Sequence, residues 1–133
     1  MGPDDVRAFF AAHFAHALDF GFEIAEITAD GAVLHLDTRS HHLRPGDTVS
    51  GPTLMTLADT AMYASLIARL GPEVGGRGVT TSMETHFLRR PGAGRMVARC
   101  RLLKVGRRLC VGVVDVEGDG ELVAHATVTY AMG

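Results

Sequence analysis

The spacing of apolar residues near the start of the chain predicts an amphipathic helix from Asp4 to about Ala17. Apolar and aromatic side chains recur there at intervals of three and four residues, which places them on one helical face. They are Val6, Phe9, Phe10, His13, Phe14 and Leu18. Either Asp4 or Asp5 can cap the start of this helix. The periodicity then changes, and residues 22–38 are expected to form a β-hairpin that turns at Asp30-Gly31.

The longest uninterrupted element that the pattern predicts is a helix from Thr53 to Leu70, with Pro52 in its first turn. Residues 39–51, RSHHLRPGDTVSG, precede it as a loop without periodicity, which is long enough to suggest a function. The helix has almost no polar face, so we expect other structure to surround it.

Four strands are expected after the helix, at 79–88, 96–105, 109–116 and 122–130. Short turns that contain glycine join the last three, which indicates an antiparallel meander. The order of elements therefore predicts an α+β fold in which an antiparallel sheet wraps around the long helix.

The composition is that of one soluble domain, residues 1–133. The chain has 13 Lys and Arg against 15 Asp and Glu, a net charge of −2, and no block of like charges. A nucleic-acid partner and a polybasic membrane anchor are therefore not expected. Because there is neither a membrane-spanning apolar run nor a basic signal-peptide start, we expect a cytoplasmic location. A hydrophobic share of 47% is high for so small a chain, and suggests that some apolar surface is an interface.

The cysteines and histidines do not suggest a metal site or a cofactor. Cys100 and Cys110 lack the spacing of a redox or metal pair and are expected to be buried free thiols. His41 and His42 are adjacent on the loop, and no matching Cys, His or carboxylate spacing accompanies them. They are expected at the surface, but His42 stays a candidate for substrate binding because it adjoins the start of the long helix.

Asp59 stands out because it lies two turns inside the apolar helix. It is too far from Pro52 to cap the helix, and an ionised carboxylate is almost never buried without a partner. One interpretation is structural, since Thr56 and Tyr63 lie on the same helical face and can satisfy its oxygens. The other is functional, because perturbed carboxylates cluster at active sites. The pattern leaves both open.

The start of the same helix, Ser50-Gly51-Pro52, is the second candidate. Its unpaired backbone N–H groups and the positive end of the helix dipole can bind a developing oxyanion. The alternative is a plain N-cap by Ser50 or Thr53. Together, an oxyanion donor and a carboxylate eight residues further on suit acyl transfer.

The stretch VSGPTLMTLADTA resembles the signature of the hotdog-fold acyl-CoA thioesterases of the phenylacetate type, the PaaI-like family, and GVTTSMETHFLRRP resembles their next strand. The likeness covers the chain from about residue 20. It implies a hotdog fold and hydrolysis of an acyl-CoA to a free acid and coenzyme A. It also implies a homodimer joined edge to edge through the sheets and paired again into a homotetramer, with each active site between protomers.

The resemblance assigns roles to three residues. The backbone N–H of Gly51 polarises the thioester carbonyl, and Asp59 acts as general base or nucleophile toward it. Thr80 falls where the family often has a Ser or Thr that orients the attacking water. In the dimer that the family forms, Gly51 and Asp59 can come from different chains.

The chain also departs from the family. Ser50 stands where the family usually has His, Pro52 replaces a second Gly and lacks an N–H, and no Asn precedes the motif. Gly51 is then the main oxyanion donor, and any polar helper must be Ser50, His42 or Arg44. Ser50 is therefore counted among the catalytic candidates.

Two sets of residues are candidates for binding acyl-CoA. Basic residues at strand ends and in the KVGRR turn suit the phosphates of coenzyme A, although exposed basic turns are common. They are Arg89, Arg90, Lys104, Arg107 and Arg108. The candidates for the acyl pocket are Met55, Met62 and Phe87, with an ordinary core stripe as the alternative.

Two other functions are weighed against hydrolysis. HHLRPGDTVSGPTL also resembles the His-containing loop of hotdog acyl-thioester dehydratases, in which His42 and Asp59 would replace the usual His and Glu. The other is a hotdog domain that binds acyl-CoA without chemistry. The cost of keeping a buried carboxylate without a use argues against it.

Overall fold

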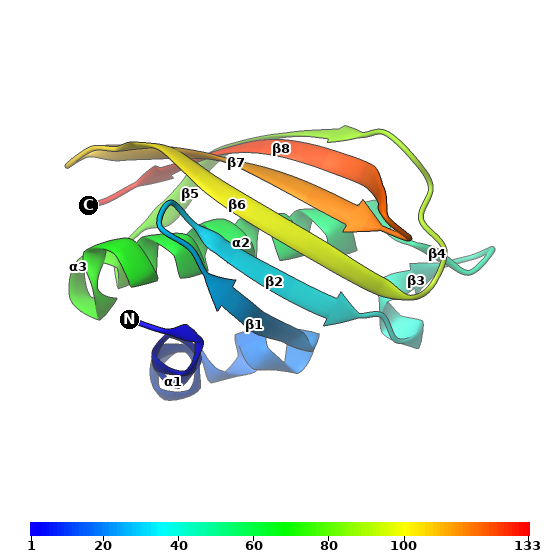
Figure 1. Ribbon diagram of the computed structural model, residues 1–133, viewed down its shortest axis with the longest axis horizontal. Helices are drawn as coiled ribbons and strands as arrows, with labels where there is room; N and C mark the ends of the chain where they lie inside the picture. The colour runs from blue at the N-terminus through cyan, green and yellow to red at the C-terminus, as the bar shows by residue number, and fades with distance from the viewer.

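A six-stranded antiparallel sheet packs along one long helix in the computed structural model, which describes residues 1–133 (Figure 1). The helix is α2, Gly51–Leu70. The order of strands across the sheet is β1-β2-β6-β7-β8-β5. Their bounds are Phe22–Ile27 for β1, Ala32–Asp37 for β2, Val79–Phe87 for β5, Arg95–Val105 for β6, Leu109–Gly118 for β7 and Glu121–Ala131 for β8. The predicted α+β arrangement, the hairpin and the meander are confirmed.

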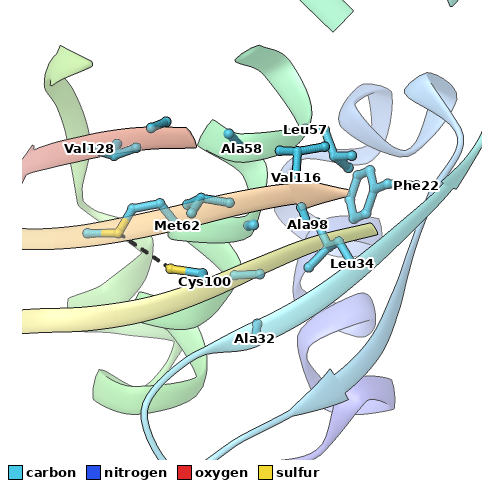
Figure 2. Close-up of a cluster of buried hydrophobic side chains, with 14 of the residues drawn as sticks. Phe22, Ala32, Leu34, Leu57, Ala58, Met62, Ala98, Cys100, Val116 and Val128 are labelled. Carbon is cyan, nitrogen blue, oxygen red and sulfur yellow. Dashed lines mark hydrogen bonds between the residues drawn. The ribbon is translucent and has the colours of Figure 1, made fainter. Parts of the chain in front are cut away.

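The core lies between α2 and the sheet face that points toward it. Alternate residues of each strand face α2, as the two-residue period of a strand requires. Figure 2 shows Leu34 and Ala98 of the sheet in the same buried cluster as Leu57 of the helix. The Met62 sulfur packs directly against Gly112 of β7. A Cβ at position 112 would lie 2.6 Å from this sulfur, so only glycine leaves room for it. Both cysteines are free and buried, and burial raises the pKa of Cys100 to about 11.

The N-terminal helix is shorter than predicted. Helix α1 spans Pro3–His13, and Ala15–Phe20 form a separate 3₁₀ helix, η1. Phe14 leaves helical geometry between them, with φ −149°. A 3₁₀ helix has nearly the same residue spacing as an α-helix, so the hydrophobic pattern could not separate the two. Asp5 assists the start from inside the helix, accepting a hydrogen bond from the N–H of Gly2 at 2.8 Å.

Short elements occupy two segments that lack periodicity in the sequence. The predicted loop 39–51 contains a 3₁₀ turn, Ser40–His42, and a small hairpin of β3, Leu43–Arg44, and β4, Thr48–Val49. The glycine-rich stretch after α2 contains the short helix α3, Pro72–Gly76. Elements of two to five residues complete too few repeats for a hydrophobic pattern to reveal them.

The first half of helix α2 is covered on one side only, whereas its second half is buried almost all round, so the prediction that the helix is surrounded holds only for the second half. The side toward the sheet is buried, whereas Pro52, Thr56 and Asp59 lie on a stripe that is exposed or half-exposed. The neighbouring edge strand β5 is also uncovered, with Val79 60% and Phe87 50% exposed. The hydrophobic pattern shows that the helix is apolar. It does not show whether the residues that cover the helix come from the same chain or from another. None of the helices is long and apolar enough to cross a membrane.

Candidate functional site

The carboxylate of Asp59 is held through one of its two oxygens. Oδ1 accepts a hydrogen bond from the hydroxyl of Thr80 at 2.7 Å and another from the hydroxyl of Tyr130 at 2.9 Å. No donor within the chain approaches Oδ2. Asp59 itself is half-buried on the open stripe of α2. A carboxylate anchored on one oxygen and free on the other can accept a proton from water or attack an electrophile.

The two hydroxyls meet because of the strand register. Thr80 of β5 lies directly opposite Tyr130 of β8, and directly opposed side chains on one face of an antiparallel pair are about 5 Å apart. Both point toward α2, where Asp59 lies. The structural interpretation, in which Thr56 and Tyr63 bond the Asp59 oxygens, is wrong, because both residues have other partners. The carbonyl of Thr56 accepts from Thr60, and Tyr63 donates to the carbonyl of Gly76 at 2.7 Å.

Tyr130 is the site residue that sequence reasoning missed. It is 3% exposed and its ring stacks on Tyr63 with centroids 6.1 Å apart. Its even-numbered position in the strand was the available signal. Side chains alternate between the two faces of a strand, so Tyr130 lies on the same inward face as Ala126 and Val128. A buried Tyr needs a hydrogen-bond partner for its hydroxyl, but only the fold identifies that partner as Asp59.

The N-terminus of α2 is the second part of the site. Ser50 is the N-cap, and its Oγ accepts from the N–H of Thr53 at 3.2 Å and bonds the Thr53 hydroxyl at 2.8 Å. Its hydroxyl therefore holds the helix end. The N–H of Gly51 has no acceptor within the chain, as expected for the first residue of a helix. The ring of Phe87 covers Gly51, since a Cβ built there would lie 3.4 Å from it.

A groove of about 400 Å³ opens in front of Gly51. Its walls come from the β3–β4 hairpin, the first turn of α2 and the residues that follow β5. They include Arg44, Phe87, Arg89 and Arg90. Arg89 lies 3.4 Å from a carboxylate oxygen of Glu121. The positive end of the helix dipole adds to the charges of Arg44 and Arg90, so the groove favours an anion or a carbonyl oxygen that gains negative charge.

His42 has a structural position that does not agree with a substrate contact. It is 1% exposed, its Nε2 donates to the carbonyl of Phe20 at 2.7 Å, and its Nδ1 accepts from the N–H of Arg39 at 2.9 Å. Burial lowers the pKa of His42, which keeps it neutral. Its carbonyl accepts from the N–H of Ser50 at 3.0 Å and the hydroxyl of Thr53 at 3.2 Å. The residue therefore supports the start of α2.

The candidates for the acyl pocket separate in the structure. Met62 is fully buried, with its sulfur 3.9 Å from Cys100 (Figure 2), so it is a core residue. Met55 is half-buried on the open side of α2. Phe87 is exposed beside Gly51. Only the last two can meet a ligand, because the sheet covers Met62.

The basic candidates also fall into two places within one chain. Arg89 and Arg90 line the groove at Gly51. The turn with Lys104, Arg107 and Arg108 lies at the opposite end of the sheet, near the C terminus (Figure 1). The five basic candidates therefore do not form one cluster within a single chain, because the long strands β5 to β8 separate the two groups.

Comparisons with known proteins agree with this architecture. Residues 46–125 match the family model of the thioesterase superfamily. A structure described as a "putative thioesterase" of Silicibacter sp. is 33% identical, with a TM-score of 0.87 over 100% of this chain and 92% of that one. A mutant of the phenylacetic acid degradation protein PaaI of Thermus thermophilus is 28% identical, with a TM-score of 0.78 over 90% and 99%. A protein of Thermoplasma acidophilum named "putative esterase" is 23% identical over 96% of this chain and 94% of its own. The predicted hotdog fold is confirmed.

Proposed function

The chain belongs to the thioesterase superfamily and is a hydrolase of thioester bonds, and from this premise we propose that it hydrolyses an acyl-CoA to a free carboxylic acid and coenzyme A. In this proposal residues 1–133 act as one catalytic domain. The observation that carries it is the Asp59 carboxylate, anchored through Oδ1 and free at Oδ2.

The reaction assigns a task to each part of the site. The N–H of Gly51 and the helix dipole stabilise the negative charge that develops on the thioester oxygen. Asp59 takes a proton from the attacking water, or attacks the carbonyl carbon to give an anhydride that water then cleaves. The thiolate of coenzyme A leaves and is protonated. The hydroxyl of Thr80 donates to Asp59 and can accept from that water.

One chain does not complete this arrangement. Gly51 and Asp59 are eight residues apart on one helix, which separates them by about 12 Å. A carbonyl group that meets both an oxyanion donor and a base needs each of them within about 3 Å. The pair that acts on one thioester therefore comes from two protomers.

The edge strand β5 supports such a dimer. Its outer edge has no strand beside it. Val79 and Phe87 of the strand are exposed, and so is Leu88 directly after it. An unpaired edge of this length readily pairs with another chain. The opposite edge, β1, is shorter, carries exposed Glu23 and Glu26, and lies beside α1, which makes it a poorer partner.

Antiparallel pairing of two copies of β5 brings the required groups together. The start of one strand then lies beside the end of the other, about 23 Å from its own start. Thr80, bonded to Asp59, is at the start of β5, and Phe87, packed on Gly51, is at its end. Asp59 of one protomer thus faces Gly51 of its partner. Further pairing into a homotetramer remains a prediction.

The same pairing places two basic groups at each site. Arg89 and Arg90 lie at the end of one β5, and the basic turn at 104–108 lies at the sheet end where the other β5 begins. Charged hydrogen bonds from arginine suit phosphate groups. The separation of the two basic groups within one chain is therefore compatible with binding the phosphates of a single coenzyme A in the dimer.

The substitution Asp59→Asn tests the proposal. It should lower turnover at least about 1,000-fold in a thiol-release assay across short, long and aromatic acyl-CoA thioesters, by removing the base or nucleophile. Asp115→Asn, on the outer face of the sheet, is the matched control and should keep full turnover. Circular dichroism checks that both variants fold.

Near-normal turnover of Asp59→Asn would refute the role of Asp59. Release of an enoyl product without thiol would favour the dehydratase, for which the fully bonded ring of His42 is poorly suited. Calorimetric binding of acyl-CoA by the wild type without any thiol release would favour a binding domain.

A further inference from the structure

We propose that Tyr130 is a positioning residue for the reaction, which fixes the Asp59 carboxylate so that Oδ2 meets the water or the thioester. This inference rests on the proposed role of Asp59 and adds to it a residue of the last strand, 71 positions away in the sequence.

Tyr130 contacts both the side chain and the backbone of Asp59. Its hydroxyl lies 2.9 Å from Oδ1 and 3.2 Å from the carbonyl oxygen of the same residue. The hydroxyl has a single proton, and the shorter contact to the carboxylate is the stronger hydrogen bond because the acceptor is charged. A group seated between the two oxygens restricts rotation of the carboxylate relative to the helix.

The two donors to Oδ1 differ in their surroundings. Thr80 is exposed on the edge strand β5, whereas Tyr130 lies on the interior strand β8 and is 3% exposed. Because the attacking water enters the proposed site beside Thr80, water can replace a lost donor there more easily than at the buried Tyr130. Tyr130 is therefore the more rigid of the two anchors.

The position of the Tyr130 ring is itself determined by its neighbours. The ring stacks on Tyr63 with centroids 6.1 Å apart. On another side it lies against Gly78, where a Cβ would come within 2.9 Å of a ring carbon. A larger residue at position 78 would have to displace the ring. This packing leaves the hydroxyl little freedom to leave Asp59.

The hydroxyl also stays protonated. Burial raises the pKa of Tyr130 far above its ordinary value, and the nearby Asp59 carboxylate raises that pKa further. The phenol therefore stays neutral, and a neutral phenol is a hydrogen-bond donor. Tyr130 therefore orients Asp59 without taking part in proton transfer.

The test is Tyr130→Phe, which removes only the hydroxyl. A misplaced catalytic group costs up to about 100-fold in rate, so we expect kcat to fall 10- to 100-fold while KM changes less than about twofold. Tyr63→Phe is the matched control. It removes a hydroxyl from the same aromatic cluster, but this hydroxyl donates to the carbonyl of Gly76 and not to Asp59. Its kcat should stay within about twofold of the wild type.

Two further comparisons separate positioning from a structural role. Adding Tyr130→Phe to Asp59→Asn should change the residual turnover less than about twofold, because the tyrosine acts through the carboxylate. Thr80→Val should lose less activity than Tyr130→Phe. A further tenfold loss in the Asp59→Asn background, a larger loss in Thr80→Val, or a raised KM with normal kcat in Tyr130→Phe would each overturn the proposal.

The same set distinguishes this inference from the proposed function. If Asp59→Asn is inactive and Tyr130→Phe is fully active, only the role of Tyr130 fails. If Asp59→Asn keeps wild-type turnover, the proposed role of Asp59 fails, and the role of Tyr130 fails with it. Circular dichroism and melting temperatures of all variants establish that each is folded under assay conditions.

Discussion

The two polar groups of the site on α2, the N–H of Gly51 and the carboxylate of Asp59, are positioned in different ways. The helix start at Gly51 is made by local sequence, with a cap at Ser50 and a free N–H in the first turn. The carboxylate at Asp59 is oriented by side chains from β5 and β8, far away in the sequence. An oxyanion donor therefore needs only a helix end, whereas an oriented base needs neighbouring strands of the sheet in register.

Gly51→Pro should lower kcat by about 100-fold or more, because it removes the N–H proposed to stabilise the oxyanion. Proline suits the first turn of a helix, so the fold should persist. Gly51→Ala is the control, since it adds a Cβ near Phe87 but keeps the N–H. Thiol release measures both. Equal losses in the two variants would attribute the effect to crowding and contradict the role of the N–H.

A mixed dimer of one Asp59→Asn chain and one Gly51→Pro chain tests whether the Asp59 and the Gly51 that act on one thioester come from different protomers. One site of the mixed dimer then carries both substitutions and the other carries neither. With two affinity tags the mixed dimer can be purified, and its thiol release should reach about half that of the wild type. Dimers of each variant alone should keep no more than about 1% of the wild-type thiol release. An inactive mixed dimer would mean that both groups act within one chain.

Arg90→Ala should raise KM for acyl-CoA about tenfold with little change in kcat, since a hydrogen bond between charged groups contributes about 1.5–3 kcal/mol. The same variant should keep its KM for an acyl-pantetheine thioester, which lacks the nucleotide phosphates. Arg95→Ala is the control, because Arg95 pairs with Asp37 on β2, outside the groove. An equal rise for both substrates would place Arg90 at the acyl part.

Ser50→Ala should lower the free energy of unfolding by about 1 kcal/mol, because the N-cap is lost. Urea denaturation measures the change. Ser40→Ala, which removes an exposed hydroxyl from the preceding 3₁₀ turn, should leave stability unaltered. Because the cap acts on the Gly51 end, kcat should change less than in Tyr130→Phe. A larger kcat loss in Ser50→Ala would point to direct catalysis by Ser50.

The smallest effect concerns His42, which supports the same helix end. Burial lowers its pKa in the folded protein, so below the ordinary value of about 6.5 the unfolded chain binds more protons than the folded one. Stability should therefore decline as the pH falls through that range. Urea denaturation between pH 7.5 and 5 should show a weaker decline in His42→Gln than in the wild type. The exposed His16→Gln should match the wild type, and an equal decline in His42→Gln would contradict the assignment.

Much of the fold could be predicted from the sequence because its long elements repeat their pattern several times. Helix 53–70 and the four later strands lie within two residues of their predicted bounds. The break in the first helix at Phe14 and the hairpin within 39–51 were missed. The 3₁₀ helix after the break nearly preserves helical spacing, and the strands of the hairpin are too short to show alternation. Neither feature therefore disturbs the periodicity on which the prediction rests.

The candidate site divides along the same line. Local sequence is enough to place a helix start with a free N–H at Gly51 and a carboxylate two turns inside the helix at Asp59, because these features depend on neighbours within one helix. The hydroxyls that hold this carboxylate, and the buried positions of His42 and Met62, are set by the packing of the sheet and the loops. Those contacts depend on strand register, which sets residues 21 and 71 positions from Asp59 beside one oxygen, and register is a property of the assembled sheet.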